Sequence, residues 1–179
     1  MTDNQLAILF RAQLLAGLAR HSAQAVPVIA SYQPTSEGRV TEAAIYFFAL
    51  PESRHGLQGR RRKVNLQTHK IDTTEVQIIQ GGFQVFALAP QDPQNLALPT
   101  AKDLVNIAAM ICNSEVFAQA MNRAGVGVQR VTEIRNPYFV NDQGQFEASP
   151  SFDIKITHQR SLSEITPVVD DFAISIHRV

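Results

Sequence analysis

Apolar residues return at every fourth position between Gln5 and Arg20. This spacing gathers them on one wide face of an α-helix, because a helix turns once in about 3.6 residues. Asp3 precedes the segment and is predicted to cap its first turn. The positions predicted to face the core are Leu6, Phe10, Leu14 and Leu18.

A second helix is predicted from Ala101 to about Ala124. Thr100 and Asp103 have the spacing of a capping box, in which each side chain accepts a hydrogen bond from the backbone of the other residue. Gly125 follows the last apolar position, where glycine commonly ends a helix. The positions predicted to be buried are Leu104, Ile107, Ala108, Ile111, Phe117 and Met121.

Strands are indicated by alternation of apolar and polar residues and by runs of β-branched and aromatic residues. The segment Phe152–Thr157 alternates strictly, which is typical of a strand with one face in water. The pair Gly81-Gly82 coincides with a change in the parity of the apolar positions, which predicts a β-bulge there. The predicted strands span residues 40–50, 75–87, 126–135, 152–157 and 172–176.

These elements predict one α+β domain over residues 1–179. Its sheet is expected to be antiparallel or mixed, with about five strands, and to carry both helices on one face. An extended loop is expected over residues 52–74, between the first two strands, because apolar periodicity disappears there. Residues 136–150 are predicted to form a second loop, with a turn at 141–144.

The segment 52–74 contains the one local concentration of like charge, namely Arg54, Arg60, Arg61, Arg62 and Lys63. A solvated, flexible loop would explain these residues, and so would an anchor for phosphate or for carboxylates on a partner. We therefore treat the five as candidate partner-interface residues. Aromatic residues are not interleaved with them, which disfavours stacking on single-stranded nucleic acid.

Composition narrows the classes of function. Sixteen basic and sixteen acidic residues give a formal net charge of zero, so no overall field draws the chain toward nucleic acid or a charged membrane. The single cysteine, Cys112, excludes an internal disulfide and fits synthesis in a reducing cytoplasm. No uninterrupted apolar run approaches the roughly 20 residues of a membrane helix, so no membrane partner is expected.

The sequence contains no recognisable catalytic, cofactor-binding or metal-binding motif. Gly125-Val126-Gly127 follows a helix, whereas a dinucleotide site places such glycines after a strand, so helix termination is the better interpretation. The five histidines never lie three or four residues apart, as a local metal-binding pair would. The adjacent carboxylates Asp170-Asp171 are interpreted as a solvated turn. We therefore expect no catalytic residue, no metal and no cofactor.

Four segments, taken in order, resemble a known family. They are Phe83–Pro93, Thr100–Asn106, Arg135–Val140 and Ser149–Asp153. In their order and combined length they are similar to the neck proteins of tailed bacteriophages, the tail-terminator group also called gateway proteins. The similarity extends from about Tyr32 to the C-terminus, and the motifs are closer to those of contractile-tailed phages.

The resemblance implies a structural role in the virion neck after synthesis in the host cytoplasm. Proteins of this group form a homo-oligomeric ring, usually a hexamer, that caps the tail tube and joins it to the collar or connector below the portal. The ring leaves a lumen through which DNA passes without sequence-specific binding. The resemblance supplies no catalytic residue and no cofactor.

Two other classes of function remain open from the residues alone. A small DNA-binding module would use the basic run from Arg60 to Lys63, but zero net charge and the lack of a recognition-helix pattern disfavour it. An enzyme with an active site assembled from distant residues would be revealed by a pocket holding paired acids.

Overall fold

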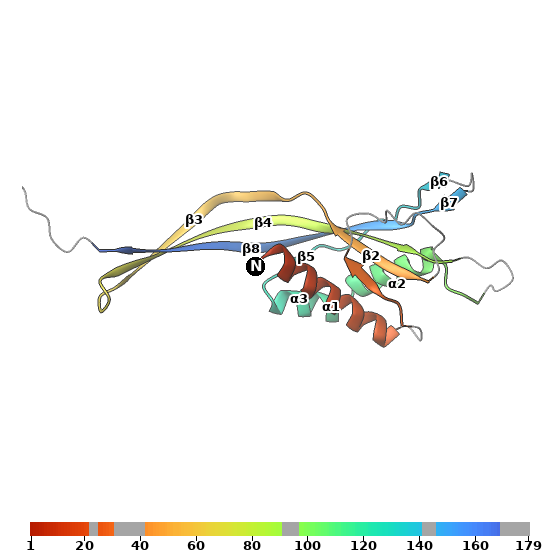
Figure 1. Ribbon diagram of the computed structural model, residues 1–179, viewed down its shortest axis with the longest axis horizontal. Coiled ribbons are helices and arrows are strands. Elements are labelled where there is room, and N and C mark those ends of the chain that lie inside the picture. Colours follow the sequence, from red (N-terminus) through yellow and green to blue (C-terminus); the bar gives the residue numbers. More distant parts are fainter. Residues whose placement is uncertain (22–24, 31–41, 91–96, 141–145, 169–179) are drawn as a thin grey trace, which may run out of the picture.

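The computed structural model describes residues 1–21, 25–30, 42–90, 97–140 and 146–168. Helices lie on one face of a six-stranded mixed sheet, so the predicted α+β class is confirmed (Figure 1). The helices are α1 (Asp3–His21), α2 (Ala101–Cys112) and α3 (Glu115–Arg123). The strands are β1 (Val28–Ala30), β2 (Ala44–Ala49), β3 (Ser53–Asn65), β4 (Lys70–Leu88), β5 (Gly127–Val128), β6 (Tyr138–Val140), β7 (Phe146–Ala148) and β8 (Ser151–Pro167).

The main sheet has the order β1-β2-β4-β8-β5, and β3 also pairs with β4. β2 and β3 lie end to end along the same edge of β4, with Pro51 between them. Proline has no backbone N–H to give to a sheet, so it suits this interruption. Leu50 extends the β2 ladder by donating its N–H to the carbonyl of Gly82 at 2.9 Å. β1 was not predicted, and its parallel pairing with β2 makes the sheet mixed.

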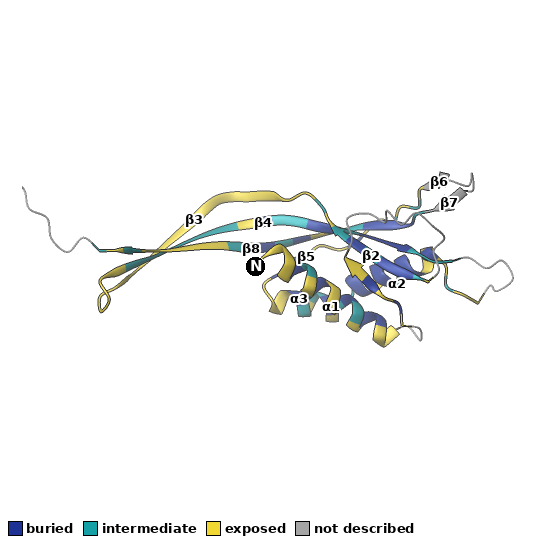
Figure 2. Ribbon diagram, viewed as in Figure 1, coloured by how far each residue is buried: buried dark blue, intermediate teal, exposed yellow. Residues whose placement is uncertain are grey.

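The bulge predicted at Gly81-Gly82 is wrong. β4 itself has no extra residue, because it pairs with β8 in one continuous antiparallel register. The register shifts lie on the other edge, one across Pro51 between β2 and β3 and one on β3 between His55 and Gly59. The parity of the apolar residues changes for another reason. Val76 and Ile78 lie where β4 pairs with β3, and Ile78 is 47% exposed. This part of the sheet extends past the helices (Figure 2), so no helix restricts its apolar residues to one face.

The buried face predicted for α1 is confirmed, because Leu6, Phe10, Leu14 and Leu18 all lie in the core. The ring of Phe10 lies 5.2 Å from that of Phe47, 4.7 Å from that of Phe83 and 6.0 Å from that of Phe117, between centroids. Such aromatic pairs add about 0.5–1.5 kcal/mol each beyond burial. One side chain of α1 thus joins β2, β4 and α3.

The single helix predicted over residues 101–124 is instead two helices, α2 and α3, bent by 57°. Asn113 exchanges two hydrogen bonds with the backbone of Val131, at 2.8 and 2.9 Å. Ser114 caps α3 by accepting a hydrogen bond from the N–H of Phe117. Short polar side chains that bind the backbone compete with helix continuation, which explains the break. Among the described residues no single helix is long and apolar enough to cross a membrane, although this bent pair reaches that length and composition together.

Both outer ends of the pair are as predicted. The N–H of Thr100 donates to Asp103 Oδ2 at 2.9 Å, and the N–H of Asp103 donates to Thr100 Oγ1 at 3.2 Å. Gly125 has a φ of 78°, a left-handed conformation that glycine adopts without steric cost. Helix termination is therefore the correct interpretation of this glycine.

The C-terminal third differs from the prediction in its strand lengths. Of the strand expected over residues 126–135, β5 pairs with β8, and Arg135 forms an isolated bridge with Ser151. The loop expected over residues 136–150 contains the β6–β7 hairpin. β8 continues well past its predicted end at Thr157. The predicted turn at 141–144 and the predicted strand 172–176 lie outside the described residues.

The extended loop predicted over residues 52–74 is also wrong. β3 and the start of β4 fill this segment as an antiparallel hairpin. Its turn is organised by Asn65, whose Oδ1 accepts hydrogen bonds from the N–H groups of Gln67 and Thr68 at 3.0 and 3.2 Å. His69 has a φ of 51° and closes the turn in the left-handed region.

Candidate assembly interface

A three-stranded ribbon, which we call the arm, projects from the helix-covered body of the protein (Figures 1 and 2). It consists of residues 53–65 of β3, 70–79 of β4 and 159–167 of β8. Every residue of β3 is exposed, and beyond the base of the arm no described helix covers either face. At about 3.3 Å per residue, residues 70–79 extend over about 30 Å.

The two faces of the arm carry different members of the basic set. Successive residues of a strand point to opposite sides. The register with β4 places Arg60 and Arg62 on the side where the helices lie, and Arg61 and Lys63 on the other side. Arg54 lies on the helix side, near the base of the arm. The structure therefore brings the five candidate residues onto one strand but divides them between two surfaces.

Arg60 has an ion-pair partner within the arm. Its Nη2 lies 2.6 Å from Glu75 Oε1, and its Nε donates to the same oxygen at 2.8 Å. Gln58 Nε2 donates to the other oxygen of Glu75 at 2.5 Å. Within the described part of the chain, the remaining basic residues of the set have no carboxylate partner, namely Arg54, Arg61, Arg62 and Lys63.

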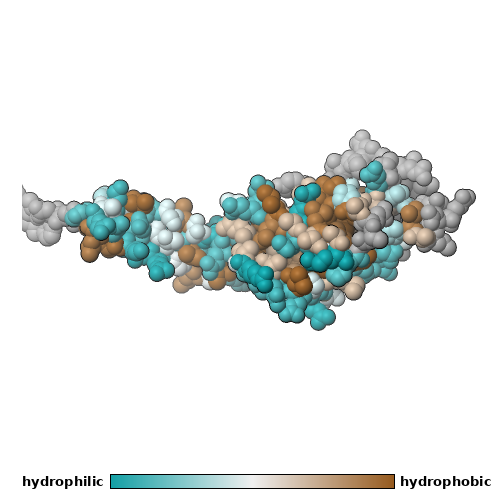
Figure 3. Space-filling model, turned by 90° about the horizontal axis from the view of Figure 1, so that it is seen from below, coloured by the Kyte–Doolittle hydropathy of each residue, from teal (hydrophilic) through white to brown (hydrophobic). Residues whose placement is uncertain are grey.

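The helix side of the arm contains a shallow hollow on the surface of the sheet. Figure 3 views the molecule from below and shows apolar and polar side chains mixed along the arm. Because a single layer of strands forms its floor, the hollow is an open surface and does not enclose a ligand. Its lining residues are Arg60, Arg62, Ile71, Thr73, Glu75, Glu164 and Thr166.

Large apolar side chains are exposed along the arm. Leu57 is 97% exposed, Leu66 82%, Leu162 68% and Ile165 64%. Single exposed apolar residues are ordinary, but a thin projecting sheet that carries several of them is typical of a surface buried by a partner. We therefore treat the arm as the candidate assembly interface.

The family of the E217 gateway protein gp29 matches the chain over residues 5–168. This range includes α2, α3, all of α1 except its first two residues, the main sheet and the whole arm. The chain belongs to this family. It is accordingly a structural protein of the phage neck, and the neck-protein resemblance found in its sequence is confirmed. No curated protein matches the chain.

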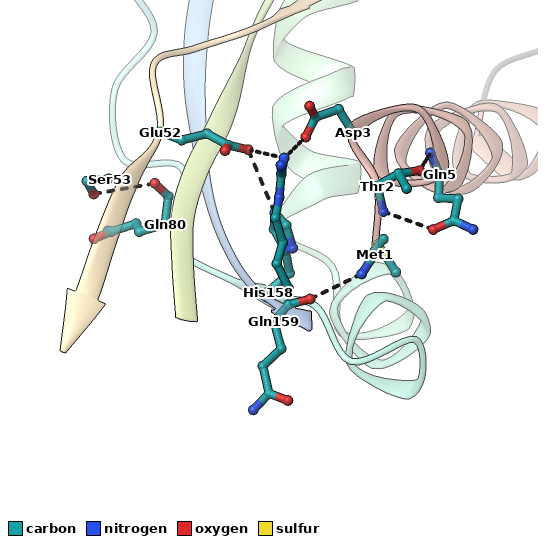
Figure 4. Close-up of polar contacts among 10 residues, drawn as sticks. Met1, Thr2, Asp3, Gln5, Glu52, Ser53, Gln80, His158 and Gln159 are labelled. Carbon is teal, nitrogen blue, oxygen red and sulfur yellow. Dashed lines mark hydrogen bonds and ion pairs between the residues drawn. The ribbon is translucent and has the colours of Figure 1, made fainter. Parts of the chain in front are cut away.

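In this member of the gateway family, a polar cluster fixes the base of the arm to the first helix (Figure 4). The terminal amino group of Met1 donates to the carbonyl of Gln159 at 3.1 Å. Arg160 forms one ion pair with Asp3, at the start of α1, and a second with Glu52, with 3.3 Å between Nη2 and Oε1. β8 is thus held to the body at the point where it leaves the helices.

His158 marks the end of the hydrophobic core along β8. Ile154 and Ile156 precede it on the helix side of the sheet, and all three side chains are buried. Its Nε2 lies 3.8 Å from Glu52 Oε1, and neither ring nitrogen has a hydrogen-bond partner in the described part of the molecule. Beyond His158 the same row continues with exposed or half-exposed side chains, so the core stops at the base of the arm.

Two ionisable groups of the body, the thiol of Cys112 and the carboxylate of Asp103, have structural roles. Burial in α2 raises the pKa of Cys112 to about 12, so the thiol stays protonated and unreactive near neutrality. The pKa of Asp103 lies below its ordinary value, first because the side chain of Thr100 donates a hydrogen bond to its carboxylate. Among the described residues, no group of three or more His, Cys, Asp or Glu is placed to hold a metal ion.

Sequence reasoning found the basic residues and missed the hairpin that carries them. Periodicity in a strand comes from one buried face, and β3 has none. A weaker signal was present in Asn65, a good turn residue, and in the β-branched residues Ile71, Thr73 and Thr74 that follow the turn. These residues would have supported a hairpin over a structureless loop.

Proposed function

We propose that this chain, as a single domain with a projecting arm, forms a closed hexameric ring that terminates the tail tube of a contractile-tailed phage. The ring joins the tube to the head connector or collar and leaves a channel for DNA. The observation that carries the proposal is the arm, a one-layer sheet about 30 Å long on a structural protein of the phage neck.

The contacts within the arm contribute little stability for a sheet of this length. Ordering each residue costs roughly 1–2 kcal/mol of backbone entropy, and a typical hydrogen bond returns only about 1 kcal/mol. Burial of apolar side chains normally supplies the rest, yet no residue of β3 is buried. Contacts with neighbouring molecules would bury Leu57, Leu66 and Leu162 and supply what the isolated arm lacks.

A ring is the closed form of a head-to-tail contact between identical chains. Such a contact closes only when its rotation divides a full circle, so the copy number in each particle is fixed. The hexamer follows from the family resemblance. The two outer strands of the arm, β3 and β8, differ from each other, and this difference supports a head-to-tail contact. High-resolution imaging of the head–tail junction in virions should show six copies in a closed ring. A single copy or a variable number would contradict the proposal, and a tail without a sheath would contradict its contractile part.

We assign the basic residues of β3 to contacts with carboxylates of partner proteins, which guanidinium groups bind in a bidentate manner. Arg60 already forms an ion pair with a carboxylate within the chain, that of Glu75. DNA in the lumen is the competing partner. A ring of such residues facing DNA would bind the phosphate backbone strongly and in a salt-dependent way, which opposes smooth passage.

Replacement of Arg60, Arg61, Arg62 and Lys63 by Ser tests the assignment. We expect that phage tails no longer join to heads, which is measured as a lower fraction of tailed particles in electron micrographs. A matched control replaces four basic residues of the body instead, and is expected to join normally. The four are Arg20, Lys102, Arg123 and Arg130. Normal joining with altered DNA release from the arm variant would show that the arm faces DNA.

A further inference from the structure

The arm has two strand edges to which no described strand is paired. β3 pairs with β4 alone. β8 pairs with β4 alone beyond Thr157, where the pairing with β5 ends. Beyond the base of the arm, each edge therefore presents a row of backbone N–H and C=O groups to which no described strand bonds, and such rows readily accept another strand.

Beyond the base of the arm the two edges have opposite charge. β3 carries four consecutive cations from Arg60 to Lys63. On β8, Arg160 is paired with Asp3 and Glu52 at the base, and Glu164 is the one charged residue from Ser161 to Pro167. Two β3 edges placed together would repel each other, because like charges on neighbouring strands are destabilising. A β3 edge placed against a β8 edge brings opposite charges together. The pairing that the charges favour is therefore head-to-tail.

Direction and register fit this pairing. β3 and β8 both run antiparallel to β4, so they are parallel to each other. Thr73 of β4 is the register partner of Arg62 on one side and of Glu164 on the other, which places these two residues level with each other on the helix side. Neither has an ion-pair partner among the described residues. In copies related by rotation about an axis along the arm, Glu164 of one copy meets Arg62 of the next.

We propose that neighbouring copies of this chain join by parallel pairing of the β8 edge of one copy with the β3 edge of the next, with an ion pair between Glu164 and Arg62 across each junction. This inference rests on the ring proposed above and specifies its interface. A second copy is the fitting partner because one arm carries both complementary edges. Repetition around a ring uses every edge, as closure of a β-barrel does.

Disulfide trapping tests the junction. In virions assembled with Arg62→Cys/Glu164→Cys, mild oxidation is expected to link neighbours into a ladder of multimers on a non-reducing gel. Within one copy the two cysteines would lie two strands apart, about 9.5 Å, which is too far for a disulfide. Each single variant is a control and is expected to remain monomeric. The native Cys112 is buried and does not take part.

The outcomes separate this inference from the proposed function. A dimer from Glu164→Cys alone would mean that β8 edges pair with each other, and would overturn the inference. The inference would also be overturned if the double variant gave no ladder although imaging showed a closed ring of this chain. In that case the proposed ring would stand and only its interface would be wrong. Virions in which the chain forms no ring would overturn both.

Charge exchange tests the ion pair. Arg62→Glu and Glu164→Arg are each expected to lower the yield of joined particles by at least about tenfold, and the double exchange is expected to restore it. Lys63 provides the control for that rescue, because its level residue on β8 is Ile165 and it lies on the opposite face. Lys63→Glu combined with Glu164→Arg should not restore the yield of joined particles. Equal rescue at both positions would show that only net charge matters and would overturn the pairing.

Discussion

Gly82 of β4 lies directly against the backbone of Ile154 on β8, so that a Cβ at Gly82 would come within 2.2 Å of the Ile154 carbonyl oxygen. Gly82→Ala is therefore expected to lower the free energy of unfolding by about 1–3 kcal/mol in urea titrations. Gly59→Ala on the arm is the matched control, because the nearest atom to its Cβ would be the carbonyl oxygen of Val76 at 3.7 Å. That change should stay within about 0.5 kcal/mol. Equal losses at the two glycines would contradict the close contact.

Phe152 is fully buried opposite Val85, in the centre of the core. Phe152→Ala is expected to reduce the unfolding free energy of the isolated chain by about 3–5 kcal/mol, because it removes buried surface and leaves a cavity. Leu162→Ala, ten positions further along the same strand, should change it by less than about 0.5 kcal/mol, because this side chain is exposed on the arm. A large loss from Leu162→Ala would mean that the core extends into the arm.

Because of the capping box, the free energy of unfolding is expected to decrease at acid pH. The pKa of Asp103 is lowered by hydrogen bonds from Thr100, so the folded chain binds this proton less readily than the unfolded chain. Its contribution is complete above the ordinary pKa of 3.8 and is lost as the pH falls through the lower folded value. Asp103→Asn should flatten this part of the curve of unfolding free energy against pH. An unchanged acid limb would mean that the cap does not form in solution.

Cys112 should be protected from thiol reagents. Burial raises its pKa from 9.0 to about 12, which lowers the thiolate fraction at pH 8 roughly a thousandfold. The folded chain is therefore expected to react far more slowly than the same chain in urea. Because the unfolded thiol ionises first, stability should also fall as the pH rises above 9.0, and Cys112→Ala should reduce that slope. Rapid labelling of the folded chain would contradict its burial.

Local chemistry and one-sided burial were readable in the sequence. The four-residue spacing from Leu6 to Leu18 predicted the buried face of α1, since the helical period alone assigns residues to faces. Thr100 and Asp103 predicted the start of α2 because a capping box involves residues three apart. Gly125 predicted the end of α3 for a similarly local reason. The basic residues of β3 were also visible in the sequence as a local concentration of like charge.

Contacts between distant residues were decided by the tertiary structure. Asn113 ends α2 through Val131, a partner that no local rule identifies. The arm lacks a buried face, so its strands have no apolar period, and their pairing depends on a register that joins Lys70 to Pro167. The register between β3 and β4 places Arg61 and Lys63 on the face opposite to the rest of the basic set. Sequence by itself determined the buried face of α1, the two outer ends of the α2–α3 pair and the charge, because these depend on residues within one turn or on counting. Only the folded sheet decided which side of the arm each charge occupies, because that depends on pairing across the whole chain.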